Sequence, residues 1–256
     1  MALVAAVGLG AGGLLFGFLL TIAGAITLLG FGLELTPTMR LVLGLVFVQG
    51  IGCAGVTFAY LRARPRVGAW LRERLGRDGA PSGFRVGASV PGVRELAVVG
   101  GGYVLALAGA GIGAVLVSRT GAETGTNQAA QMGMENPETL LLLIPASFLI
   151  IGPGEELLFR GVVQGRLREV FRPGVAIVLA SVVFAGLHWF AISGGTLTGN
   201  LLGLAVLVVP ALILGTSYEY TDNVVVPSLI HGAYNATLFA GLYVSVVYGG
   251  QVAALL

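Results

Sequence analysis

The sequence predicts an all-α fold, a polytopic membrane helix bundle of seven to eight transmembrane helices. Two observations support this prediction. The 256 residues are 56% hydrophobic and only 10% charged, with a mean hydropathy of +0.93, whereas about a quarter of the residues in an ordinary soluble domain are charged. The apolar residues also lie in runs of bilayer length. The net charge of +2 is too small to indicate a nucleic-acid partner, and the single Cys53 excludes a disulfide framework.

Seven segments are long and apolar enough to cross a hydrocarbon core of about 30 Å, which takes about 20 helical residues. They must be helical because lipid offers no partner to exposed backbone groups. The first and last runs are long, so eight helices remain open. The N-terminal run has no basic residue before Arg40, unlike a cleavable signal peptide, and we expect a retained span. The seven segments are 4–33, 41–61, 96–117, 139–160, 174–192, 199–217 and 224–248.

The arginines predict which loops face the cytoplasm. All fourteen basic residues are arginines, and eight of them lie in the loop 62–95. Cytoplasmic loops carry an excess of basic residues, so we expect 62–95 and the basic loop 161–173 on the cytoplasmic side. The more acidic loop 118–138 then lies outside, in a multi-pass protein of the cell membrane. Apolar residues at helical spacing within 62–77 fit either a short helix on the inner leaflet or a solvated loop.

Glycine pairs four residues apart allow helices to approach closely in lipid. We expect packing contacts at four such pairs. They are Gly8/Gly12, Gly13/Gly17, Gly109/Gly113 and Gly161/Gly165.

Ionisable side chains inside membrane helices are costly, and each one suggests a function. Here they are few and gathered in three short apolar segments, which contain both histidines and the only adjacent pair of acidic residues. The segments are Glu155-Glu156-x-x-x-Arg160, Phe184-x-x-x-His188 and His231-x-x-x-Asn235.

Helical spacing predicts how these side chains pair. Glu156 and Arg160 are four residues apart and meet on one helix face, so we expect an ion pair. Glu155 points about 100° away and has no partner in its own helix, which makes it the candidate chemical carboxylate. His231 and Asn235 are also four apart and project together.

Two kinds of chemistry suit this set. A buried carboxylate beside an imidazole can take a proton from water, and a second histidine with an amide can stabilise an oxyanion. This combination hydrolyses an amide with no cofactor. Alternatively, Glu155, His188 and His231 are suitable zinc ligands that leave one position for water. The zincin motif HExxH is absent from the sequence.

These motifs resemble those of the CPBP family, which comprises the type II CAAX prenyl endopeptidases and related bacteriocin-processing and immunity proteins. The resemblance covers about residues 138–248. It implies that Glu155 activates water with help from His188, that His231 and Asn235 stabilise the oxyanion, and that Glu156 and Arg160 support the site. It leaves zinc open, and it implies a peptide or lipidated protein substrate.

We therefore expect one membrane domain, with N-terminal helices over 1–130 and a catalytic core over 138–248. The expected function is that of an intramembrane endopeptidase acting on membrane-associated substrates, with its site toward the cytoplasmic side. Two alternatives stay open. A non-enzymatic scaffold or immunity protein would bind a partner through the arginine-rich loop. A proton-coupled transporter would also bury Glu and His, but it predicts internal repeats, and the buried ionisable groups all follow residue 150.

Overall fold

The structure is a bundle of long helices that follow the apolar runs. The computed structural model describes residues 2–75 and 84–253. Six helices in this part are long and apolar enough to cross a membrane, so the predicted all-α, multi-pass fold is confirmed. Three of them are single helices: α1 (Ala2–Gly30), α4 (Val93–Ser118) and α10 (Leu197–Thr221). The other three change helix type along their length, and their π-helical or 3-10 stretches are labelled η. The second span runs through α2 (Pro37–Gly44), η1 (Leu45–Gly55) and α3 (Val56–Leu75); the fourth through α6 (Glu138–Ala146), η2 (Ser147–Ile151), α7 (Gly152–Glu156), η3 (Leu157–Gln164) and α8 (Gly165–Arg168); and the fifth through α9 (Pro173–Leu187) and η4 (His188–Ala191).

The predicted count of seven to eight spans is not confirmed. The seventh predicted segment corresponds to α11 (Val225–Ala253), a single helix of 29 residues that is not among the six. The polar groups of His231, Tyr234 and Asn235 lower its hydropathy. The remaining elements are short: α5 (Gln128–Glu135), and strands β1 (Thr126–Asn127) and β2 (Ile192–Ser193), which pair antiparallel.

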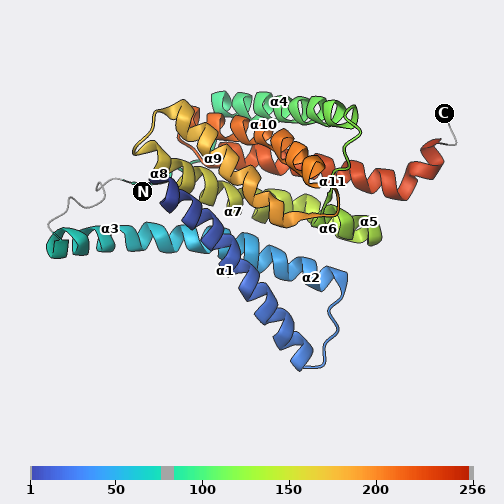
Figure 1. Ribbon diagram of the computed structural model, residues 1–256, viewed down its shortest axis with the longest axis horizontal. Helices are drawn as coiled ribbons and strands as arrows, with labels where there is room; N and C mark the ends of the chain where they lie inside the picture. Colours follow the sequence, from blue (N-terminus) through green and yellow to red (C-terminus); the bar gives the residue numbers. More distant parts are fainter. Residues whose placement is uncertain (1, 76–83, 254–256) are drawn as a thin grey trace.

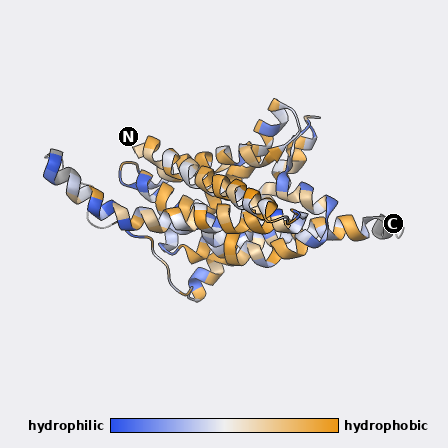
Figure 2. Cartoon of the chain, turned by 90° about the horizontal axis from the view of Figure 1, so that it is seen from below, coloured by the Kyte–Doolittle hydropathy of each residue, from blue (hydrophilic) through white to orange (hydrophobic). Residues whose placement is uncertain are grey.

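The C-terminal helices lie in the middle of the bundle. In Figure 1, α1 and the α2–α3 helix lie on one side of them and α4 lies on the opposite side, next to α10. Apolar residues dominate the long helices, and hydrophilic residues gather toward helix ends and loops (Figure 2). The largest buried apolar cluster includes Phe159, Val163 and Phe184, together with residues of α1, η1 and α10. The N-terminal helices therefore complete the core around the three motifs.

Close glycine contacts join helices at two of the four predicted pairs, and a third pair has close contacts with a segment that is not helical. A Cβ on Gly13 would lie 2.8 Å from the Gly52 carbonyl oxygen, so α1 packs directly on the backbone of η1. Gly109 and Gly113 face valine side chains of α10. Gly161 faces Val86 and Gly165 faces Phe84, so this pair packs against the segment 84–92, which is not helical. Gly8 and Gly12 have no neighbour within 4 Å of a Cβ position among the described residues, so the packing contact predicted there is not found in this part of the chain.

The predicted loop 62–95 is helical in its first part. Helix α3 continues to Leu75, because arginine, alanine and leucine are good helix formers. Residues 76–83 of that loop lie outside the described part of the chain. Arg64 of α3 pairs with Glu169, next to α8, so the two basic segments predicted to share one side of the membrane do meet in the structure.

Candidate active site

The first and third motifs meet because two helices touch at glycine. A Cβ on Gly152 of α7 would lie 2.7 Å from the Ser228 carbonyl oxygen of α11, and one on Gly232 would lie 3.0 Å from the Ser147 carbonyl oxygen. Such contacts leave no room for larger residues. They bring His231 of α11 beside the two glutamates of α7.

Glu156 lies at the centre of a buried charged cluster. Its Oε1 accepts a hydrogen bond from Nδ1 of His231 at 2.8 Å, and its Oε2 lies 3.1 Å from Nε of Arg160. Glu156 and Arg160 are completely buried and His231 nearly so. Arg160 also donates to the Ala211 carbonyl oxygen. One carboxylate therefore holds both the arginine four residues ahead, as helical spacing predicted, and the histidine of another helix.

His231 makes its hydrogen bond to Glu156 rather than to Asn235 of its own helix. The histidine turns toward Glu156, because a buried ring nitrogen gains more from a carboxylate than from an amide in its own helix. Asn235 is half-buried, one turn further along α11, and makes no side-chain hydrogen bond with the described residues.

Glu155 has a partner that the sequence reasoning missed. Nε2 of Gln49 donates to its Oε1 at 2.8 Å, from helix η1. Its Oε2 is buried without a hydrogen-bond partner among the described residues and lies 3.9 Å from Nε2 of His231. The sequence could have indicated Gln49 as a candidate site residue, because its polar amide stands in the middle of an apolar span.

The second motif joins the site through its phenylalanine. The Phe184 ring lies 4.4 Å from the His188 ring and 6.0 Å from the His231 ring, measured between centroids. The Arg160 guanidinium lies 4.8 Å from the centre of the same ring, a cation–π distance. His188 is half-buried at the end of α9, and its Nδ1 contacts the Phe184 carbonyl oxygen at 2.8 Å. A carbonyl only accepts, so Nδ1 donates, and Nε2 carries the lone pair of the neutral ring.

The donor set does not fit the zinc alternative as the side chains are arranged. Within residues 2–75 and 84–253, no three His, Cys, Asp or Glu side chains are grouped so that they could hold a metal ion. Of the three ligands in that alternative, His231 and Glu155 lie near each other. His188 is not grouped with them, although its Nδ1 contact with the backbone would leave Nε2 free for a ligand.

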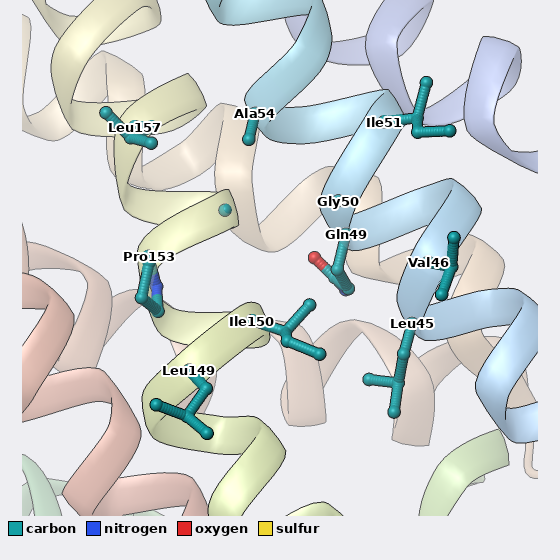
Figure 3. Close-up of a pocket in the computed structure, with 11 residues that line it drawn as sticks. Leu45, Val46, Gln49, Gly50, Ile51, Ala54, Leu149, Ile150, Pro153 and Leu157 are labelled. Carbon is teal, nitrogen blue, oxygen red and sulfur yellow. The ribbon is translucent and has the colours of Figure 1, made fainter.

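A cavity of about 400 Å³ lies between η1 and the chain of η2, α7 and η3, and Gly154 and Gln49 are among its lining residues. Its lining is apolar except for Gln49. Figure 3 shows the Gln49 side chain pointing from η1 into the gap, toward Ile150 and Pro153. Glu155 itself does not line the cavity, but its hydrogen-bond partner Gln49 does.

A comparison with protein families supports the peptidase reading of the three motifs. Residues 137–237 match the family model described as type II CAAX prenyl endopeptidase Rce1-like. Over this segment the chain is similar to the Rce1-like family. The matched segment contains all three motifs, and the family supports an intramembrane endopeptidase activity of the CAAX type. No curated protein and no solved structure matches the chain significantly.

Proposed function

We propose that the chain hydrolyses peptide bonds of membrane-associated, CAAX-type lipidated substrates by means of water activated at Glu155. The observation that carries the proposal is the buried cluster of Glu155, Glu156 and His231, formed by two of the motifs inside the Rce1-like core. Burying ionisable side chains in a membrane protein costs free energy, and such side chains usually mark a functional site.

The proton path follows from the hydrogen bonds. Oε2 of Glu155 has free lone pairs, so it accepts a proton as water attacks the peptide carbonyl carbon. The lone pair on Nε2 of His188 accepts from the second hydrogen of that water. When the tetrahedral intermediate collapses, Glu155 returns its proton to the leaving amine, and the carbon–nitrogen bond breaks.

The oxyanion is stabilised from α11. In the protonated ring of His231 both nitrogens donate, so Nε2 can reach the oxyanion while Nδ1 stays on Glu156. The free amide of Asn235 supplies a second donor. Glu156 and Arg160 hold His231 in place and do not touch the substrate.

The site opens, in this proposal, toward the cytoplasmic side of the cell membrane. The arginine-rich helix α3 and the basic segment around Glu169 meet at one end of the bundle, and basic segments favour the cytoplasmic side. Substrate would reach Glu155 from that side. Fluorescent labelling of single cysteines introduced near α3, in intact cells against lysed cells, tests this orientation.

A cleavage assay tests the function. Purified protein in detergent is incubated with C-terminal CAAX peptides, with and without a prenyl group, and the products are identified by mass spectrometry. We expect the wild-type protein to cleave the prenylated peptide and the Glu155→Ala variant to be inactive. Cleavage of neither peptide, together with a silent Glu155→Gln variant in cells, would instead favour a membrane scaffold.

A further inference from the structure

The contact between Gln49 and Glu155 connects two parts of the chain that are 106 residues apart. Gln49 lies outside the matched segment 137–237. It belongs to η1, an eleven-residue π-helical stretch inside a membrane helix. Such stretches widen the helix locally and are frequent at functional sites.

Glycines fix the position of Gln49 relative to the site. A Cβ on Gly154 would collide with the Gln49 carbonyl oxygen, so α7 and η1 touch backbone to backbone. On the other face of η1, a Cβ on Gly52 would lie 2.7 Å from the Gly13 carbonyl oxygen of α1. Helix η1 is therefore held between two close contacts, and the Gln49 side chain reaches Glu155 from a fixed base.

The hydrogen bonds also orient the Gln49 amide. Its Oε1 lies 3.7 Å from Sγ of Cys53, a weak donor one turn away. Its Nε2 therefore faces Glu155, where it donates to Oε1 of the carboxylate at 2.8 Å. An ionised carboxylate only accepts hydrogen bonds, so this direction is the one that the pair requires.

The contact makes the two oxygens of Glu155 different. Oε1 is occupied by Gln49, whereas Oε2 has no hydrogen-bond partner among the described residues and lies 3.9 Å from Nε2 of His231. Without the amide, the carboxylate is free to rotate about its last side-chain bond. The oxygen next to His231 would then no longer be fixed.

We infer that Gln49 is a positioning residue of the active site, which holds the Glu155 carboxylate so that Oε2 is the oxygen that takes the proton from water. The inference rests on the proposed function, because it assigns Glu155 the role of base. It gives the N-terminal helices a part in the chemistry beyond packing around the core.

The test compares steady-state kinetics of wild-type protein with those of Gln49→Met, in which a side chain of similar length lacks the donor. We expect kcat to fall about 10- to 100-fold, the value of a hydrogen bond to a charged group, while KM stays within about twofold. The matched control is Thr57→Val, which removes another buried polar group of the same membrane helix that makes no hydrogen bond with the described residues. It should keep the wild-type kcat.

The outcomes separate the inference from the proposed function. An unchanged kcat in Gln49→Met, with Glu155→Ala inactive, would overturn the positioning role and leave the proposed function standing. A rise in KM alone would show that Gln49 acts only as a wall of the apolar cavity. A wild-type protein without peptidase activity would overturn both. Should Gln49→Met fail to fold, Gln49→Asn replaces it, since its amide is one carbon too short for the contact and kcat should fall as well.

Discussion

Replacing Arg160 by methionine tests the buried charged cluster most severely. Arg160 and Glu156 have no exposed surface, so the substitution leaves a buried carboxylate with His231 as its remaining partner. Removing one member of a buried pair costs about 3–5 kcal/mol. Because His231 still donates to Glu156, we expect the lower end, a free energy of unfolding reduced by about 3 kcal/mol.

The measurement is a denaturant titration of purified protein in mixed micelles, followed by circular dichroism. Arg166→Met is the matched control, because Arg166 pairs with Glu169 at a partly exposed position, where an ion pair contributes about 0–1 kcal/mol. The double variant Arg160→Met/Glu156→Gln should lose less stability than the sum of its single variants, since residues in contact couple by about 0.5–3 kcal/mol. Equal losses in Arg160→Met and Arg166→Met, or strict additivity in the double variant, would refute the central role of Glu156.

Three further predictions follow from the packing and the proposed mechanism. Gly154→Ala should lower stability by about 1–3 kcal/mol and also lower kcat in the same titration and assay, because a Cβ there displaces Gln49. Gly12→Ala, which lies within α1 with open space around it among the described residues, should keep the wild-type kcat and lose no stability, since alanine is the better helix former by up to about 1 kcal/mol. Asn223→Ala should make the segment 84–92 more sensitive to limited proteolysis, because the buried Asn223 amide hydrogen-bonds to the backbone and the hydroxyl of Ser89. An unchanged digestion pattern would contradict this. Dialysis against a strong chelator should leave turnover intact if side chains alone activate water. Loss of activity that only added zinc restores would show that zinc is required.

Local spacing was enough to predict an all-α bundle of long apolar helices and the pair of Glu156 with Arg160, but not the number of spans. Bilayer length and hydropathy determine where a membrane helix runs, and residues four apart meet on any helix. The three motifs were also readable, because ionisable residues stand out in apolar sequence. The roles assigned to Glu155, His188 and Asn235 remain predictions.

The contacts between helices were not predictable in the same way. The partners of His231 and Glu155 depend on how each helix is rotated and how closely it approaches its neighbour. In this bundle, contacts at glycines such as Gly152 and Gly154 set both quantities. The π-helical stretches add a further rotation that a regular helical period does not anticipate. For these reasons the sequence did not predict that His231 contacts Glu156 or that Gln49 contacts Glu155, although Gln49 stands out as an amide inside an apolar span.

The most direct test of the central claim is the turnover number of Glu155→Gln on a prenylated CAAX peptide. Glutamine keeps the size of the side chain but cannot take a proton from water, so kcat should fall about 100- to 10,000-fold while the unfolding midpoint stays near that of the wild type. Glu138→Gln, an exposed acid at the start of α6, serves as the control and should remain fully active. Turnover by Glu155→Gln within about tenfold of the wild type, below the usual contribution of a general base, would contradict the assignment of Glu155 as the base.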